Sequence, residues 1–469
     1  MKSKIKFFLL IVIVFFLNFT PIHSIEGFNF EVTEIEIIDN GNKFLGKDRG
    51  KITTDSRVVI EADNFTYNKL TNILKLNGSV IIDDKNRNLK IYSEEVIYFK
   101  NKEIFTSEKN SKFINTEDNL EISAEKFNYN KSTNVLKLKN NVKIKDINND
   151  YIVNADNVNY LRNSEKLFTI GKTNAIIKSK YDFNSSNVEL LRNESILISN
   201  EKTKIFDKNS KVYELDSFKY DINKEILQAK NLYILSDASV PASKSDHLRF
   251  ESGFFNLKDN SFIAGKTEIN LKKDSFDNIE NDPRLKGVSS MSNNKITTVR
   301  KAIFTSCKKR DDKCPPWSIK AKKITHDKNK KRLIYDHAVL NVYDKPVMYF
   351  PKFFHPDPSV ERQTGFLRPQ LNNSEILGSS LYLPYFYVIS DSKDFTFKPT
   401  IFENDIYMFQ NEYRSEKKNS SLITDFSLTT GYKSSLSDKK NSISHIFSKY
   451  ELDLNFPNYE KSNFNFFLE

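Results

Sequence analysis

The chain has 469 residues, and its 72 lysine and arginine residues outnumber 61 aspartate and glutamate residues, giving a formal net charge of +11. The basic residues are spread along the chain, so this charge is compatible with an anionic partner but does not by itself indicate one. After the N-terminal segment no run reaches about 18 consecutive apolar residues, which excludes helical membrane spans and leaves an exported soluble chain or membrane-spanning strands.

The N-terminus has the layout of an export signal. Three lysines precede an apolar run at 7–19, Pro21 ends that run, and Ser24 is a small residue suited to the cleavage site. The run is short for a transmembrane helix, so the pattern predicts a secretory signal at 1–24. An N-terminal membrane anchor is the alternative.

A repeat occupies the region from about 51 to 273. IEADNFTYNKLTNILKLNGSVII from Ile60 aligns with ISAEKFNYNKSTNVLKLKNNVKI from Ile122, which lies two repeats later. The aligned positions recur with a nearly constant period of about 30 residues, at Ala62, Ser93, Ala124, Ala155, Ser185 and Leu215. A fixed period of this size predicts stacked structural units rather than one globular core. We assign the repeat-containing domain to 25–313.

Each unit contains two strand-like halves around a polar turn. Apolar residues alternate with polar ones, which predicts strands with one buried face. The residues expected to face inward are Leu74, Leu76, Val80, Leu136, Leu138 and Val142. Two interpretations fit these side chains: an ordinary packed core, or a groove in which two sheets separate enough to hold an acyl chain. The segment that follows the repeats favours the groove.

Cys307 and Cys314 are the two cysteines of the chain. In an exported protein, such a pair predicts a disulfide. A zinc site is the alternative, but the spacing is not C-x2-C and two further ligands would be needed. We therefore expect no metal.

The segment 314–369 differs sharply in composition from the repeats. It contains the only tryptophan, Trp317, together with Pro315, Pro316, Pro346, Pro351, Pro356, Pro358 and Pro369. Because proline fixes φ and lacks an N–H donor, this density predicts a rigid connection rather than the interior of a regular element.

Aromatic-rich alternating segments of about ten residues follow Gly365, among them LYLPYFYVIS, DFTFKPTIF, IYMFQNEYRS and SSLITDFSLTTGY. This pattern is typical of transmembrane β-strands, which we assign to 370–469; a soluble β-sandwich is the alternative. The segment from Ile376 to Glu469 suffices for about six strands, whereas single-chain barrels have at least about eight. We therefore expect further strands beyond residue 469.

The stretch YDKPVMYFPKFFHPDPSVERQTGFLRPQ resembles the boundary between the periplasmic domain and the barrel in the LPS-assembly LptD family (organic solvent tolerance, OstA). The resemblance runs from about Cys314 into the strands after Ile376. It implies an all-β chain with a periplasmic β-jellyroll, or β-taco solenoid, of the type shared with LptA and LptC, followed by the first strands of an outer-membrane β-barrel. This chain would then be the N-terminal portion of a longer protein.

The resemblance also implies a function and partners. Members transport lipopolysaccharide into the outer leaflet of the outer membrane through a lateral opening of the barrel. An LptE-type lipoprotein plugs the barrel, and an LptA-type periplasmic bridge delivers the lipid. The expected location is therefore the outer membrane, with the N-terminal domain in the periplasm.

Two prolines match family positions at the lateral opening: Pro384 in YLPYF and Pro399 in FKPTIF. Because proline donates no ladder hydrogen bond, it suits a weak seam between strands. Placement at strand ends or membrane interfaces is the alternative. The cysteines depart from the family pattern, in which early cysteines are coupled to a late pair, so Cys307 and Cys314 are expected to form a local bridge instead.

Catalytic chemistry is not indicated. The sequence contains no G-x-S-x-G, P-loop or H-E-x-x-H motif. His326-Asp327 and Asp336-His337 are neighbours on predicted strands, so the two members of each pair point to opposite faces. We expect a transporter without catalytic residues or cofactors, and nucleic-acid binding is unsupported in an exported chain. The alternatives are a surface-displayed adhesive β-solenoid anchored by a barrel, and a hydrolase of envelope lipids or sugars.

Overall fold

The computed structural model describes residues 27–273, 280–309, 315–357, 360, 362–375, 377–403, 405–434, 437–454 and 462–468. Within these ranges the chain is built from β-strands, which confirms the all-β prediction. The helical elements there are four 3-10 turns, η1 (Lys85–Arg87), η2 (Lys100–Lys102), η3 (Arg162–Ser164) and η4 (Ala242–Lys244). None of the described helices has the length and apolar character needed to cross a bilayer. The predicted signal at 1–24 lies outside the described residues.

The chain divides into two compact units. The first comprises Met1–Lys323 and Val339–Met348, and the second comprises Ile324–Ala338 and Tyr349–Glu469. Hydrogen bonding defines two sheets, one formed by β1 to β29 and one by β30 to β38. Each unit is described by itself below.

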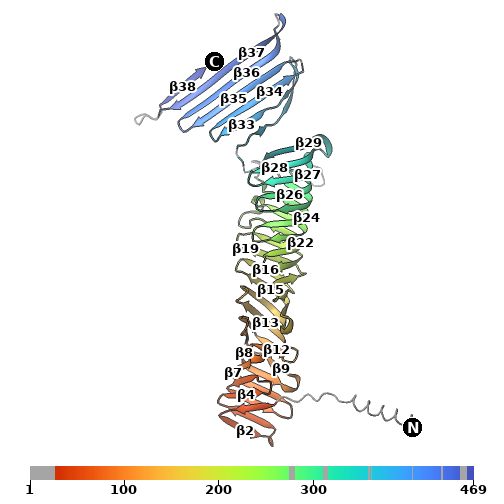
Figure 1. Ribbon diagram of the computed structural model, residues 1–469, viewed down its shortest axis with the longest axis vertical. Coiled ribbons are helices and arrows are strands. Elements are labelled where there is room, and N and C mark those ends of the chain that lie inside the picture. The colour runs from red at the N-terminus through yellow and green to blue at the C-terminus, as the bar shows by residue number, and fades with distance from the viewer. Residues whose placement is uncertain are drawn as a thin grey trace, which may run out of the picture. The chain divides into compact units, whose positions relative to one another are not determined.

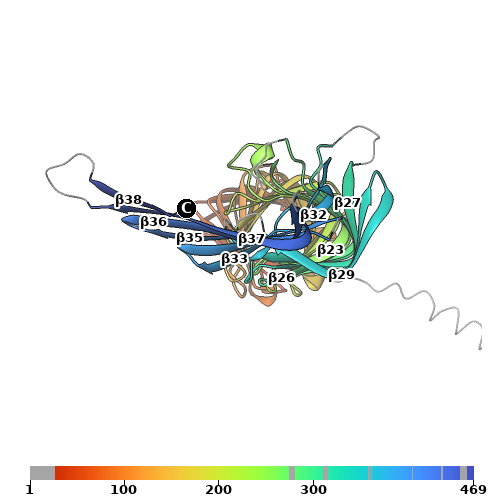
Figure 2. The ribbon, with the colours of Figure 1, turned by 90° about the horizontal axis from the view of Figure 1, so that it is seen from above.

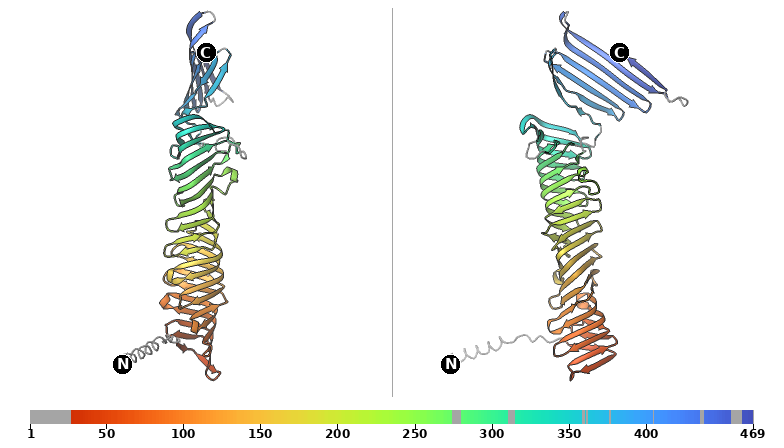
Figure 3. Two further views of the ribbon diagram at one scale, coloured as in Figure 1. Left: turned by 90° about the vertical axis from the view of Figure 1, so that its right-hand side faces the viewer. Right: turned by 180° about the vertical axis from the view of Figure 1, so that it is seen from behind.

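The first unit is a stack of antiparallel strands in chain order (Figures 1 and 3). Its N-terminal strands are β1 (Phe28–Glu31), β2 (Glu34–Ile38), β3 (Lys43–Lys47), β4 (Gly50–Thr54), β5 (Val59–Ala62), β6 (Asn64–Asn68), β7 (Ile73–Asp84), β8 (Leu89–Phe99), β9 (Ile104–Ser107), β10 (Ser111–Asn115), β11 (Leu120–Ala124), β12 (Lys126–Asn130) and β13 (Val135–Asp146). They continue as β14 (Tyr151–Leu161), β15 (Lys166–Ile177), β16 (Tyr181–Ser186), β17 (Glu189–Leu191), β18 (Ile196–Ser199), β19 (Thr203–Asp207), β20 (Val212–Leu215), β21 (Ser217–Asp221), β22 (Ile226–Leu235), β23 (His247–Asn256), β24 (Ser261–Asn270), β25 (Arg284–Ser292) and β26 (Ile296–Thr305). Strands β27 (Trp317–Asp327), β28 (Arg332–Val342) and β29 (Lys345–Pro356) complete the first sheet.

Short strands in this sheet are halves of interrupted long strands. Strand β7 pairs with β6 through its first half and with β5 through its second half. Strand β13 pairs in the same way with β12 and β11. Each repeat unit therefore supplies two full-length strands, some continuous and some interrupted at the midpoint. This arrangement confirms the stacked repeat expected from the sequence.

Several continuous strands carry a residue of left-handed conformation at the midpoint. Gly78 of β7 has φ of +75°, Asn140 of β13 has +62°, and Gly171 of β15 has +88°. The ladder register shifts at all three of these midpoints. Glycine and asparagine tolerate this conformation better than other residues, so they favour the bulges that turn a strand. An added Cβ at Gly78 would lie 2.5 Å from Asp63 Oδ2.

The first sheet folds along the line of midpoints. Inward side chains from both halves of each strand join one buried cluster, which extends from Ile52 to Ala264. Because the two halves pair independently, the hydrogen bonds also form closed rings. The eight strands β15, β16, β19, β20, β22, β21, β18 and β17 form one such ring. The result is a continuous apolar interior enclosed by two layers of strand.

The second unit contains an open antiparallel sheet. Its strands are β30 (Gly365–Phe366), β31 (Gln370–Ser374), β32 (Gly378–Tyr382), β33 (Tyr385–Ser390), β34 (Lys393–Phe402), β35 (Tyr407–Lys417), β36 (Ser420–Ser434), β37 (Ser437–Asp453) and β38 (Asn463–Leu468). Consecutive long strands pair as a meander from β33 to β38, and they lie side by side in Figure 2. No pairing joins β38 back to β30 or β31 among the described residues, so a closed barrel stays a prediction.

Candidate functional site

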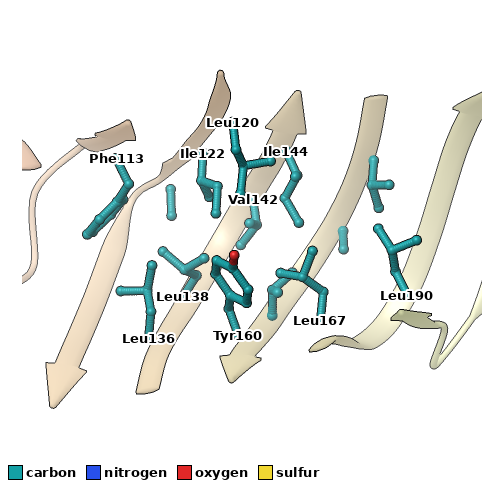
Figure 4. Packing of buried hydrophobic residues seen from close by; sticks show 14 of the residues in the cluster. Phe113, Leu120, Ile122, Leu136, Leu138, Val142, Ile144, Tyr160, Leu167 and Leu190 are labelled. Atoms are coloured by element: carbon teal, nitrogen blue, oxygen red, sulfur yellow. The ribbon is translucent and has the colours of Figure 1, made fainter. Parts of the chain in front are cut away.

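The apolar interior of the first unit contains all six residues predicted to face inward. Leu74 and Leu76 have 0% exposed surface, and the others are 1–2% exposed: Val80, Leu136, Leu138 and Val142. Figure 4 shows Leu136, Leu138 and Val142 on the same side of the sheet as Tyr160 and Leu167. The inward orientation is therefore confirmed, whereas contact of these side chains with a lipid stays a prediction.

Turns from the two ends of the strands meet on the side of the folded sheet opposite the line of midpoints. We call this region the mouth; it lies where the turns at 131–134, 162–165 and 192–195 face the turns at 55–58, 85–88 and 116–119. Three contacts close it, each between residues 74 or 75 positions apart: Lys131 Nζ to Ser56 Oγ at 2.6 Å, Arg162 Nη2 to the Arg87 carbonyl at 2.7 Å, and Arg192 Nη1 to Asp118 Oδ2 at 3.5 Å. The sequence predicted polar turns between the strands but did not predict that turns of different repeats meet in this way.

A buried ion cluster lies at one end of the mouth. Arg192 and Asp146 have side chains 5% and 0% exposed, and Arg192 Nη2 lies 3.0 Å from Asp146 Oδ2. The same guanidinium donates to the hydroxyls of Tyr151 at 3.3 Å and Tyr160 at 3.1 Å. Burial alone raises the pKa of Asp146, but hydrogen bonds from Asn149, Arg192 and Tyr151 outweigh it and hold this pKa below its ordinary value.

This depressed pKa predicts acid sensitivity of the first unit. An aspartate of the unfolded chain titrates near about pH 3.9, so the stability that Asp146 contributes is present above that pH. It is lost as the pH falls through the lower pKa of the folded state. Urea midpoints measured between about pH 6 and about pH 2.5 should therefore fall more steeply for the wild type than for Asp146→Asn. Parallel pH profiles would contradict the prediction.

One face of the second sheet exposes large apolar side chains. The strand register places on this face Leu381, Leu383, Tyr387, Ile401, Tyr407, Phe426, Leu428 and Ile446. Each is between 37% and 50% exposed. Water-soluble proteins rarely expose a continuous apolar surface of this kind, whereas strands that face lipid do so regularly.

The opposite face of this sheet carries a chain of polar contacts across four strands. Lys398 of β34 pairs with Glu412 of β35. Gln410 donates to Asp425 of β36 at 3.0 Å, and Asp425 lies 3.4 Å from Nε2 of His445 on β37. The same face also exposes Ile423, Ile443 and Phe447, so it is mixed rather than uniformly polar. In barrel strands apolar side chains face the lipid and the interior face is the more polar one.

The two predicted seam prolines each remove one rung of a strand ladder. The Pro384 carbonyl accepts a hydrogen bond from Leu367 N at 2.9 Å, and the Pro399 carbonyl accepts one from Leu383 N at 3.1 Å. Paired residues of an antiparallel ladder normally exchange two such bonds. Because proline has no N–H, neither proline can return a hydrogen bond. Pro384 thus weakens the pairing between the interrupted strand β32–β33 and the first strand of the sheet. Pro399 weakens the pairing between β34 and that interrupted strand.

A third proline was not included among the predicted seam residues. Pro369 lies in the interruption between β30 and β31, which together form the first strand of the sheet. The interval from Pro369 to Pro384 equals the interval from Pro384 to Pro399. This equal spacing was visible in the sequence, but Pro369 was assigned to the proline-rich connection.

The histidines highlighted by the sequence have separate partners. His326 Nε2 lies 2.6 Å from Asp357 Oδ2, and Nδ1 of His337 lies 2.7 Å from the Tyr349 hydroxyl. The structure therefore pairs neither histidine with its sequence-adjacent aspartate. The predicted bridge between Cys307 and Cys314 stays a prediction, because Cys314 lies outside the described residues.

Comparison with known proteins gives two kinds of match. The family profile described as "Lipopolysaccharide-assembly, LptC-related" matches residues 44–148, within the repeat-containing domain. Curated relatives include LPS-assembly protein LptD of Polaromonas sp. strain JS666, which is 30% identical over 158 residues. LPS-assembly protein LptD of Legionella pneumophila strain Paris is 28% identical over 116 residues, and that of Idiomarina loihiensis is 25% identical over 177 residues.

Each match covers only part of this chain and only part of the relative. They cover 31%, 25% and 36% of this chain in the Polaromonas, Legionella and Idiomarina comparisons, respectively. They cover 19%, 13% and 22% of those relatives. The chain thus matches about a fifth or less of the length of most of these relatives.

Proposed function

We propose that this chain, which is a relative of the LPS-assembly protein LptD family over part of its length, carries lipopolysaccharide. Its destination would be the outer leaflet of the outer membrane. The observation that supports this function best is the apolar interior, which continues without interruption from Ile52 to Ala264 through the stacked strands. A globular protein buries a compact core, whereas a stacked interior of this length offers one apolar path along many repeats.

In the proposed mechanism, acyl chains move along the interior of the repeat-containing domain, 25–313, while the sugar head stays in water. The proline-rich segment 314–369 connects this domain to barrel strands at 370–469. Lipid leaves through a seam that contains Pro384, Pro399 and also Pro369. An LptA-type bridge supplies the lipid, and an LptE-type lipoprotein occupies the barrel. The amphipathic second sheet supports the barrel part of the proposal.

Site-specific photocrosslinking in cells tests the interior. With the probe at Leu76 or Leu138, both 0–1% exposed, we expect adducts with lipopolysaccharide that disappear when the lipid supply is cut. The neighbouring Lys75 and Lys137 are exposed on the other face of the same strands, because successive side chains alternate. Probes there serve as matched controls and should give no adduct.

Absence of adducts at both inward positions, in correctly assembled protein, would reduce the repeats to a packed spacer. The alternative is an adhesive β-solenoid displayed on the cell surface and anchored by a barrel. It predicts that external protease cleaves the repeats on intact cells, whereas the transport function predicts that the periplasm protects them.

A further inference from the structure

Basic residues recur at the equivalent point of the first five aligned repeats, whereas Ile222 occupies that point in the sixth. We call them the cation row: Lys69, Lys100, Lys131, Arg162 and Arg192. They follow one another with the period of the repeat, about 30 residues. A tyrosine stands two positions before each of the first four, at Tyr67, Tyr98, Tyr129 and Tyr160. The row therefore belongs to the repeat itself and follows one edge of the mouth.

The later members of the row are buried although they lie in turns. The side chain of Lys131 is 3% exposed, and Arg162 is 7% exposed. Long cationic side chains are seldom buried unless they are paired, because desolvation of the charge is costly. Contacts at the mouth must therefore offset the desolvation of these two charges.

Neutral oxygens on the opposite edge of the mouth lie close to both of these cations. Lys131 Nζ lies 2.6 Å from Ser56 Oγ across the mouth and forms a longer ion pair with Glu103, at 3.8 Å. Arg162 donates to Asn134 Oδ1 at 3.0 Å and to the Arg87 carbonyl at 2.7 Å. Arg192 differs, since it is held by the buried carboxylate of Asp146. Lys131 and Arg162 are thus positive charges joined across the mouth to hydroxyl and carbonyl groups.

These contacts can be exchanged for a stronger anionic partner. Arginine forms bidentate hydrogen bonds with phosphate, and lysine binds phosphate as a point charge. A phosphorylated amphiphile whose acyl chains enter the interior must separate the two edges of the mouth, which breaks the contacts of Lys131 with Ser56 and of Arg162 with Arg87. Its phosphate groups then reach the released cations while its sugars stay outside.

We infer that Lys131 and Arg162 bind the phosphate groups of a phosphorylated glycolipid whose acyl chains occupy the interior. This inference rests on the proposed function and adds the headgroup contacts to it. Consecutive members of the row are separated by two strands, or about 10 Å. A phosphate released by one cation can therefore be received by the next as the lipid advances.

Binding measurements on the full chain in detergent test this inference. The probes are diphosphorylated lipid A and the same lipid with both phosphates removed. We expect the wild type to bind the phosphorylated lipid about tenfold more tightly, since hydrogen bonds between charged groups are stronger than neutral ones. The double variant Lys131→Gln with Arg162→Gln should lose this preference and retain its affinity for the dephosphorylated lipid. Lys131→Arg with Arg162→Lys should restore the preference.

The matched control removes the same charge from the outer face, at Lys137 and Lys143, which are exposed. Glutamine at both positions should leave the preference unchanged. The inference would be overturned if the control and the Lys131–Arg162 variant lost the preference for the phosphorylated lipid equally. It would also be overturned if that variant kept the preference. Displacement of the lipid by an equal concentration of inorganic phosphate would also overturn it, because the row would then recognise free phosphate.

The outcome separates the inference from the proposed function. Equal binding of both lipids by the wild type would leave transport through the interior in place and reject the phosphate contacts alone. Failure of the wild type to bind either lipid would reject the proposed function and the inference with it.

Discussion

Replacing Arg192 by methionine is expected to lower the free energy of unfolding by about 3–5 kcal/mol, because it leaves a buried carboxylate without its cation. Asp146 is 0% exposed and lies 3.0 Å from Arg192. Its remaining neighbours, Asn149 and Tyr151, hydrogen-bond to the carboxylate but do not neutralise it. The loss can be measured as a shift in the urea midpoint and as faster amide exchange in β13 to β18.

Two companion variants show whether the buried charge is the cause. The double variant Arg192→Met with Asp146→Asn should recover part of the loss, since removing both charges avoids an unpaired buried group. Lys112→Met breaks an exposed pair, Lys112 with Glu121 at 3.2 Å, and should cost at most about 1 kcal/mol. An Arg192→Met loss no larger than that of Lys112→Met would contradict the prediction.

Replacing Pro384 and Pro399 by valine is expected to slow delivery of lipopolysaccharide to the cell surface. Valine at 384 can donate to the Leu367 carbonyl, and valine at 399 to the Leu383 carbonyl, which restores both missing rungs. Each added hydrogen bond contributes about 0.5–1.5 kcal/mol, and about 1.4 kcal/mol corresponds to tenfold in rate. The double variant should therefore be slower by about fivefold to about 150-fold, measured by pulse-labelled lipid arriving at the surface.

A matched control is Pro241→Val, since Pro241 is exposed in a loop between β22 and β23. It should transport at the wild-type rate. Wild-type transport by the Pro384–Pro399 double variant, with normal assembly, would show that the prolines are not part of a seam.

Much of the architecture was predictable from local patterns. Alternation of apolar and polar residues identified the inward face, because side chains on a strand alternate with a period of two. Leu74, Leu76, Leu136 and Leu138 are accordingly buried. The family resemblance drawn from the proline-rich segment is confirmed by the partial matches to LPS-assembly protein LptD. About six strands were expected after 376, and the described residues form six once β32 and β33 are counted as one strand interrupted at Pro384.

The interruption of strands was not predictable in the same way. Strands β11 and β12 are separated at Glu125, whereas β13 continues through Asn140 and Asn141 in left-handed conformation. Apolar and polar residues alternate in a similar manner in both segments. Whether a strand breaks or bulges depends on its neighbours in the folded sheet, where the midpoint must turn from one layer to the other.

Local patterns are sufficient to identify the period of the repeat, the inward face of each strand and the amphipathic pattern after 376, because each depends on residues close together in the chain. The burial of the turn cations depends instead on contacts between distant repeats. Lys131 meets Ser56 and Arg162 meets Arg87 across 75 residues. Such contacts depend on how the sheet folds along its midpoints and brings both strand ends together, and neither periodicity nor spacing encodes that fold.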